Sequence, residues 1–415
     1  MKAYLVGGAV RDALLGRTGG DRDWVVVGST PRQMMDAGYT PVGQDFPVFL
    51  HPQSREEYAL ARTERKTAPG YRGFAFRADP SVTLEDDLSR RDLTINAMAM
   101  DADGSLIDPH GGRSDLQAGV LRHVSPAFCE DPVRILRLAR FAARYDGFTV
   151  AEETMCLARS MVEQGEVDAL VPERVWQELS RGLMETRPSN MFRLLDDCAA
   201  LVRLLPELRL NWTRMVWTDG TSSLCAGDRW MRALDLSAAL SAALPARFAC
   251  TFHDLDPLPF ATSEVAREFV PTRQRHPLLA ALCERLRVPG ECRALAELIA
   301  RESAALHACL GADASQLLRL LESCDALRRR YRFESVLLVC ECDARSWPGA
   351  RDAAYPQSFR LRAALQSALA VDSGPVAAQA ARQGLAGSGI GQAIHEARIA
   401  AIARDLPRRT ATPQG

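Results

Sequence analysis

The stretch Tyr4–Gly28, YLVGGAVRDALLGRTGGDRDWVVVG, decides how the N-terminal part of this chain folds. It opens with a short β-prone run, and the glycine pair Gly7-Gly8 then allows a turn in which the backbone approaches a ligand closely. A helix is expected next, from Ala9 to Leu15. The N–H groups at the start of this helix and the guanidinium of Arg11 together predict a phosphate-binding site.

Two aspartates stand near the other end of this stretch, before the β-prone run Val25-Val26-Val27. Residues two apart in a strand point to the same side, so the carboxylates of Asp21 and Asp23 are expected to project together. Mg²⁺ prefers oxygen ligands and commonly binds through one or two carboxylates plus substrate phosphates. The pair therefore predicts a Mg²⁺ site for nucleotidyl transfer, where the metal activates a 3′-hydroxyl and stabilises a pyrophosphate leaving group. Taken alone, Asp-x-Asp before a strand is also typical of a turn.

Length and composition narrow the class of protein. A chain of 415 residues is expected to form two to four domains. It has no membrane-length apolar run and no signal-peptide pattern, so we expect a cytoplasmic protein. Its 11 cysteines show no C-x-x-C spacing, which argues against a zinc site and disulfides. The chain also lacks the P-loop and G-x-G-x-x-G motifs of other nucleotide-binding folds.

The order of the glycine pair, Arg11, Asp21 and Asp23, followed later by Arg90-Arg91-Asp92, carries a family resemblance. These residues resemble the catalytic head of class II tRNA nucleotidyltransferases, the bacterial CCA-adding enzymes and their poly(A) polymerase relatives. The resemblance runs from Met1 to about Leu205. It implies that Asp21 and Asp23 are catalytic and hold Mg²⁺, and that Gly8, Arg11 and Arg91 contact the nucleotide triphosphate.

The resemblance also implies the domain organisation. The expected fold class is α+β, with a head built on a small mixed sheet with helices and an otherwise helical remainder. We expect a nucleotidyltransferase head at 1–140, a helical neck that completes the nucleotide pocket at 141–205, a degenerate HD-like segment at 206–271, a helical tRNA-binding body and tail at 272–405, and a disordered tail at 406–415.

Two local patterns predict strands in the head. Residues 30–60 alternate turn signals with short apolar runs, as expected of a small antiparallel sheet. The β-prone run Leu93–Met100 reaches a turn at Asp101–Gly104 and then returns, which predicts a hairpin.

The stretch Glu130–Phe141, EDPVRILRLARF, predicts a helix with arginines recurring every three or four residues beside an apolar face. Such a stripe is ordinarily a solvated face. The E-D-x-x-R pattern ahead of further arginines, however, resembles the family's amino-acid template for selecting the incoming base. It implies that Asp131 and Arg134 read the base while Arg137 and Arg140 hold the nucleotide. Cytosine and adenine each pair an exocyclic amino donor with a ring-nitrogen acceptor, so one carboxylate and one guanidinium can serve both.

The basic, Gly- and Pro-containing stretch Ala61–Phe74 predicts a mobile loop. In CCA-adding enzymes a flexible loop at this position helps the pocket change from CTP to ATP, whereas relatives that add only CC lack it.

Some bacterial members carry an HD phosphohydrolase module after the neck, and here only fragments of its motifs remain. His253-Asp254 matches the paired motif, Arg229 stands about where the first histidine is expected, and no downstream histidine pair follows. Two ligands rarely hold a divalent metal. We therefore expect a degenerate module without phosphohydrolase activity, persisting as a helical spacer.

The favoured function is addition of CCA to the 3′ end of tRNA from CTP and ATP, with pyrophosphate release and Mg²⁺ as cofactor. A poly(A) polymerase on the same scaffold is the nearest alternative, and a partial CC- or A-adding enzyme is another. A non-enzymatic RNA-binding protein would fit a head that had lost Asp21 or Asp23, and both are present.

Overall fold

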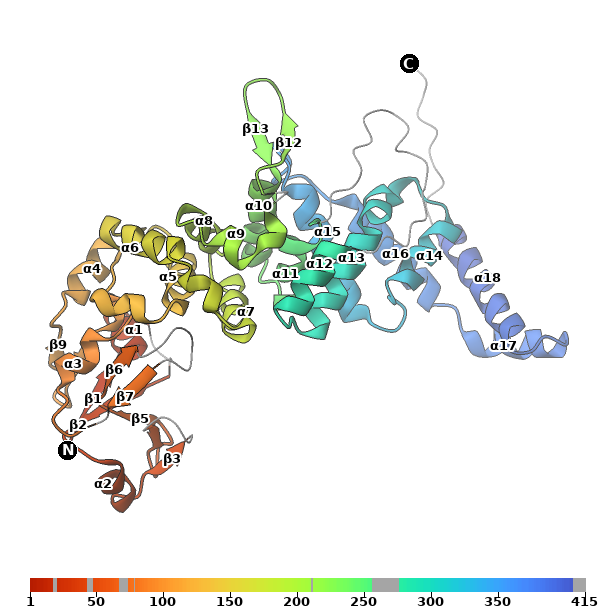
Figure 1. Cartoon of the computed structure of the whole chain (residues 1–415). Coiled ribbons are helices and arrows are strands. Elements are labelled where there is room, and N and C mark those ends of the chain that lie inside the picture. Colours follow the sequence, from red (N-terminus) through yellow and green to blue (C-terminus); the bar gives the residue numbers. More distant parts are fainter. Residues whose placement is uncertain are drawn as a thin grey trace. The chain divides into compact units, whose positions relative to one another are not determined.

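In the computed structural model the chain divides into two compact units, Met1–Pro206 and Glu207–Gly415. The structure describes residues 1–17, 21–42, 48–66, 74–77, 79–209, 212–255 and 276–405. Figure 1 shows most of the strands in the N-terminal part of the chain, and helices with one β-hairpin, β12–β13, through the rest.

A mixed sheet forms the base of the first unit. Within the described residues its strands lie in the order β3-β4-β5-β2-β1-β8-β9. Their bounds are β1 Lys2–Val6, β2 Asp23–Val27, β3 Thr40–Val42, β4 Val48–Leu50, β5 Glu57–Leu60, β8 Ala99–Met100 and β9 Leu106–Ile107. The mixed sheet and the mostly helical remainder confirm the predicted α+β class. The antiparallel expectation for residues 30–60 was wrong in part, because β5 pairs in parallel with β2 and because helix α2, Pro31–Asp36, occupies the first part of the stretch. A capping box between Thr30 and Gln33 starts that helix, which sequence reasoning overlooked.

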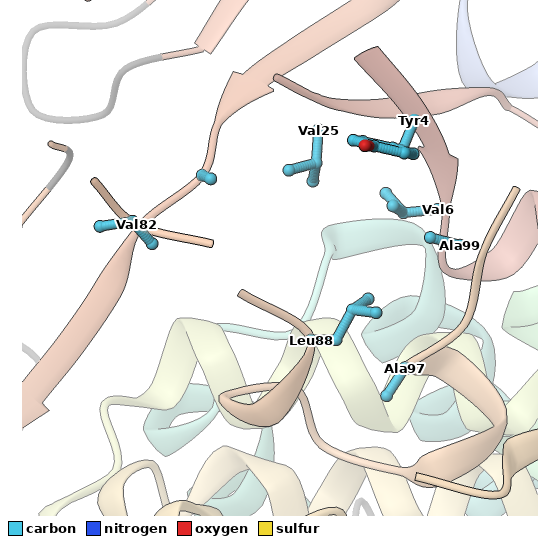
Figure 2. Packing of buried hydrophobic residues seen from close by; sticks show 8 residues of the cluster. Tyr4, Val6, Val25, Val82, Leu88, Ala97 and Ala99 are labelled. Atoms are coloured by element: carbon cyan, nitrogen blue, oxygen red, sulfur yellow. The ribbon is translucent and has the colours of Figure 1, made fainter. Parts of the chain in front are cut away.

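The two faces of strand β2 are buried in different clusters. Val25 packs with Tyr4, Val6 and Leu88 on one face, as Figure 2 shows. Val26 packs on the other face with Met34, Phe49, Tyr58 and Leu60. Burying a valine side chain contributes roughly 1.5–3 kcal/mol, and a one-residue slip would reverse both faces. The register of β2, and with it the position of Asp23 at its first residue, is therefore strongly specified.

The helix predicted after the glycine pair is present as α1, Gly8–Leu14. Gly7 has a φ of 67°, a conformation that L side chains rarely adopt, and a Cβ there would lie 2.9 Å from Nη1 of Arg91. Gly16, also at positive φ, follows the helix as expected. The glycine pair thus serves close approach of an arginine as well as the turn itself.

The hairpin predicted from Leu93 is present only at its end. Residues Thr94–Asn96 form a 3₁₀ turn, η1, and only Ala99–Met100 and Leu106–Ile107 pair as strands β8 and β9. The cause is polar bonding inside the turn: Asn96 Nδ2 donates to Asp92 Oδ1 at 3.0 Å. In a strand, residues four apart are about 13 Å apart and cannot make this bond.

The remaining elements of the first unit are short strand pairs and helices. Strands β6 (Thr63–Lys66) and β7 (Phe74–Arg77) pair antiparallel, and β10 (Val120–Leu121) and β11 (Thr149–Val150) pair in parallel. The helices are α3 Leu84–Ser89, α4 Gly112–Ala118, α5 Val133–Arg144, α6 Glu152–Glu163, α7 Pro172–Leu183, α8 Ser189–Asp197 and α9 Leu201–Leu204. Helix α5 packs on α7 and α8, which brings the arginine helix against the predicted neck.

The second unit is mostly helical. Its elements are β12 Met215–Thr218, β13 Ser223–Cys225, α10 Ala226–Ala239, α11 Leu244–Phe252, α12 Pro277–Arg285, α13 Gly290–Ala308, α14 Ala314–Ser323, α15 Arg330–Arg345, α16 Pro356–Leu369, α17 Ser373–Arg382 and α18 Ser388–Asp405. The segment expected as a helical spacer contains α10 and α11 and, before them, the β12–β13 hairpin, which was not expected. Asp219 holds the turn of this hairpin, because its carboxylate accepts from the N–H groups of Thr221 and Ser222. Residues 256–275, the centre of the predicted mobile loop and the predicted disordered tail lie outside the described residues. No helix in the described part of the chain is long and apolar enough to span a bilayer.

Candidate active site

One cavity of about 840 Å³ in the first unit brings together all of the residues predicted for the nucleotide site. Its lining includes Gly8, Arg11, Asp21, Asp23, Arg91, Asp131, Arg134, Arg137 and Arg140. They come from α1, the start of β2, the segment before η1, and α5. Residues more than a hundred positions apart in the sequence therefore meet at one site.

Asp21 and Asp23 lie together at the rim formed by the start of strand β2. Burial raises the pKa of Asp23, and the neighbouring charges of Glu57 and Asp21 raise it further while Arg91 lowers it. Glu57 is the direct partner of Asp23 across the parallel pair of β2 and β5. Because a cation would relieve the repulsion among these carboxylates, the site fits a divalent metal.

Carboxylate oxygens are also the ligands that Mg²⁺ prefers. Among the described residues, no group of three or more His, Cys, Asp or Glu is placed to hold a metal by itself. Asp21 and Asp23 would thus supply two oxygen ligands of Mg²⁺, and a bound nucleotide and water would supply the others. Sequence reasoning missed Glu57, since only the pairing of β2 with β5 places it beside Asp23.

A buried hydrogen-bond chain fixes the arginines of the cavity. Arg11 donates to Asn96 Oδ1 at 2.5 Å, Asn96 donates to Asp92 Oδ1 at 3.0 Å, and Arg137 donates to Asp92 Oδ2 at 2.7 Å. Although burial acts to raise it, the charge of Arg137 and these hydrogen bonds hold the pKa of Asp92 far below its usual range. Asp92 and Asn96, which sequence reasoning did not assign, therefore position two predicted nucleotide ligands.

Arg91, which also lines the cavity, is held by a different carboxylate, that of Asp87. Its Nη2 donates to Asp87 Oδ2 at 3.2 Å, and Asp87 is fully buried in α3. The Nε of Arg91 is buried and has no hydrogen-bond partner among the described residues. A buried donor without a partner is costly, which favours an anionic ligand in this cavity.

The arginines of α5 are more deeply buried than a solvated stripe would be. Arg134 and Arg140 are 7% and 8% exposed. Arg134 donates to the backbone carbonyls of Ala127 and Arg90, at 2.6 and 2.7 Å. Arg140 donates to Glu178 of α7 at 2.6 Å, and its guanidinium lies over the Phe141 ring. At Arg134 and Arg140, therefore, the stripe is not a solvated face, whereas Arg137 and Arg144 remain partly exposed.

The predicted base-reading residues have partners that the sequence did not reveal. Asp131 accepts two parallel hydrogen bonds from Arg174 of α7, at 2.9 and 2.7 Å. Its Oδ1 also accepts from the backbone N–H of Val133 at 3.1 Å, which fixes it at the start of α5. Bidentate arginine–carboxylate pairs fix orientation as well as distance. Arg174 therefore belongs to the geometry of the site.

The fold and the site together define a nucleotidyltransferase head: a mixed sheet carries paired carboxylates at the rim of an arginine-lined cavity. The sequence profile of the family described as "Poly A polymerase head domain" matches residues 3–122, and that of the family described as "Probable RNA and SrmB-binding site of polymerase A" matches residues 147–210.

Relatives and solved structures extend the match over the whole chain. The "Multifunctional CCA protein" of Leptothrix cholodnii is 57% identical over 98% of this chain and 97% of its own, and that of Variovorax paradoxus is 55% identical over 97% and 99%. The chain belongs to this family of multifunctional CCA proteins. Its fold is similar to that of the Thermotoga maritima CCA-adding enzyme complexed with tRNA, with a TM-score of 0.65 at 21% identity, covering 98% of this chain and 88% of that one.

A second polar cluster, in the other unit, corrects the ligand count made from the sequence. Beside His253 and Asp254 the structure places His307 of α13 and Asp343 of α15, which sequence spacing did not connect with them. Arg229 of α10 lies among them and pairs with both Asp254 and Asp343. The two residues counted in the segment 206–271, His253 and Asp254, therefore lie beside two further side chains from outside that segment.

The Asp92 network predicts a specific stability defect. Replacing Asp92 with Asn should lower the free energy of unfolding at pH 7 by about 2–3 kcal/mol, because Arg137 loses the charge that holds it, although Arg137 stays partly solvated, and Asn96, which holds Arg11, loses a charged acceptor. Urea unfolding of the two proteins measures the difference.

The pH dependence of that difference is a control. The pKa of Asp92 is depressed in the folded protein, so its contribution is present above about pH 4, the unfolded value, and declines as the pH falls below it. A difference between the proteins that stays constant down to pH 2 would contradict an ionised Asp92.

Proposed function

We propose that this protein adds CCA to the 3′ end of tRNA, using CTP and ATP and releasing pyrophosphate without a nucleic-acid template. The observation that carries the proposal is that every residue predicted for this reaction lines one cavity, in a chain 57% identical to a multifunctional CCA protein. Solved CCA-adding enzymes of similar fold are complexed with tRNA and with CTP, which supports the same partners here.

Asp21 and Asp23 would hold the Mg²⁺ of the reaction, and Mg²⁺ would supply activation of the 3′-hydroxyl and stabilisation of the leaving pyrophosphate. The repulsion that raises the pKa of Asp23 supports this role. Arg11 and Arg91 line the same cavity, and each is already oriented by a carboxylate or amide. They bind the triphosphate together with Arg137, Arg140 and the backbone at Gly8.

Base selection rests on Asp131 in this proposal. Its carboxylate accepts from an exocyclic amino group, which CTP and ATP carry and UTP lacks at the corresponding position. Arg134 donates to the backbone carbonyls of Ala127 and Arg90, which fixes its position beside Asp131 in the cavity lining. In this proposal it supplies the second contact to the base. Arg174 fixes the plane of the Asp131 carboxylate, so it is a positioning residue for the template.

We also propose that the His253 region has no metal-dependent phosphohydrolase activity. With four groups in the cluster, a shortage of ligands no longer supports this. The support now comes from Arg229, whose guanidinium contacts the carboxylates of Asp254 and Asp343. A positive charge among the ligands opposes the binding of a second cation.

The catalytic assignment predicts that Asp21→Ala and Asp23→Ala each abolish incorporation of labelled CTP and ATP into tRNA lacking its 3′ end. The affinity for tRNA in a filter-binding assay should stay within about twofold, because each substitution removes only one small side chain and no basic contact to the phosphate backbone. Sequencing the products of the unmodified protein separates full CCA addition from poly(A), CC-only or A-only addition. A variant that adds CTP at the normal rate would refute the assignment.

The template assignment predicts that Arg174→Ala weakens base selection. Loss of the bidentate partner should reduce the preference for CTP over UTP by about tenfold, corresponding to one misdirected hydrogen-bonding group. Ratios of kcat/KM for the two nucleotides measure it. Arg181→Ala is the matched control, because Arg181 lines the cavity from the same helix but pairs with Glu178. Its removal should lower kcat/KM for all nucleotides by the same factor. Equal weakening in both variants would disprove the positioning role.

For the second unit we expect no hydrolysis of a 2′,3′-cyclic nucleotide with Ni²⁺, Mn²⁺ or Mg²⁺. Inorganic phosphate and nucleotide products would be measured for the purified chain and for His253→Ala. Turnover that disappears in the His253→Ala variant would show that this region is a working phosphohydrolase.

A further inference from the structure

The cluster around Arg229 lies where four helices of the second unit pack on one another. Helix α10 contributes Arg229, α13 contributes His307 and α15 contributes Asp343, while His253 and Asp254 follow α11 directly. Helices α11 and α15 pack on each other, and each of them also packs on α10 and on α13. A buried charged cluster at such a position affects the stability of the whole unit.

The guanidinium of Arg229 is buried between two carboxylates. Its Nη2 donates to Asp254 Oδ2 at 2.5 Å, and its Nη1 donates to Asp343 Oδ1. The indole of Trp347 covers it, with the ring centroid 5.0 Å from Cζ. Arg229 thus bridges the two carboxylates, and Asp343 also lies beside the imidazoles of His253 and His307.

The two histidines are oriented as metal-binding histidines usually are. His253 Nδ1 lies 2.7 Å from the backbone carbonyl of Ala249, which only accepts, so Nδ1 carries the proton and Nε2 faces Asp343 at 3.6 Å. His307 Nδ1 bonds the Tyr355 hydroxyl, and its Nε2 lies 3.2 Å from Asp343. An outer hydrogen bond on one ring nitrogen, with the other directed inward, is the arrangement that supports metal coordination.

We propose that Arg229 takes the place of a divalent cation in a site otherwise built from His253, Asp254, His307 and Asp343. As the side chains stand, no set of three or more such groups in the described residues is placed to hold a metal, as expected if the guanidinium keeps them apart. Two carboxylates and two imidazoles form a ligand set suited to Ni²⁺, Zn²⁺ or Mn²⁺. This proposal does not depend on nucleotidyl transfer.

If Arg229 takes the place of a cation, a bound metal ion should restore the stability that is lost when Arg229 is removed. In full-length Arg229→Ala, the melting temperature in chelator should fall by about 10 °C, because two buried carboxylates lose their cation. Ni²⁺ should then restore most of the loss, whereas the unmodified protein should show no such rise. Arg247→Ala is the matched control, since Arg247 is equally buried but donates to the backbone carbonyl of Ala242. It should be destabilised without rescue.

Calorimetric titration with Ni²⁺ tests the ligands directly, in chains that also carry Asp21→Asn and Asp23→Asn to remove the site in the head. The chain with Arg229→Ala should bind Ni²⁺ at least tenfold more tightly than the same full-length chain that keeps Arg229. Adding His307→Ala should abolish this gain in affinity. If Arg229→Ala does not fold, Arg229→Gln with Asp254→Asn removes one charge of each sign and retains three ligands.

Absence of Ni²⁺ rescue and of added binding in these variants would overturn the proposal. So would tight Ni²⁺ binding by a chain that keeps Arg229 if that binding is lost on His253→Ala, because the ion would then share the site with the guanidinium.

Discussion

The buried carboxylate of Asp92 is the constraint on which the geometry of the nucleotide cavity depends. It stands at the centre of a hydrogen-bond chain that orients Arg137 directly and Arg11 through Asn96. A buried carboxylate is stable only when it is paired and hydrogen-bonded, and Asp92 also accepts from the N–H of Leu93. Because every one of its bonds ends on a residue of the head or of α5, the sheet and the arginine helix are fixed relative to each other at the site.

The chemistry of the cavity follows from how its arginines are held. A guanidinium has five N–H donors in a rigid fork, so one edge can bond a carboxylate while other donors remain for a ligand. Arg91 on Asp87 and Arg137 on Asp92 illustrate this division. Most of the positive charge in the cavity is therefore balanced by the protein itself. Binding of a triphosphate then depends on prepared geometry more than on net charge, consistent with a formal net charge of −1 for the whole chain.

Much of the head was predictable because its signals are local. The turn at Gly7, the helix after it and the spacing of Asp21 and Asp23 are properties of a single short stretch, and the family resemblance then pointed to Arg91 and the arginines of α5. What the sequence could not show are pairings set by tertiary contacts. Glu57 is adjacent to Asp23 only because β5 pairs with β2, and Arg174 meets Asp131 only because α7 packs on α5. Asp343 lies far along the chain from His253, so no spacing rule connects them.

The error at Leu93–Asn96 shows how function and local structure are coupled. β-Propensity favoured a strand there, but a strand would have carried Asn96 away from Asp92 and left Arg11 without its acceptor. The 3₁₀ turn instead places Asn96 where one amide both donates to Asp92 and accepts from Arg11. The two buried networks of the chain differ in which charged group lies at the centre. In the head a carboxylate fixes arginines that face a ligand, whereas around Arg229 a guanidinium fixes carboxylates that would otherwise face one another.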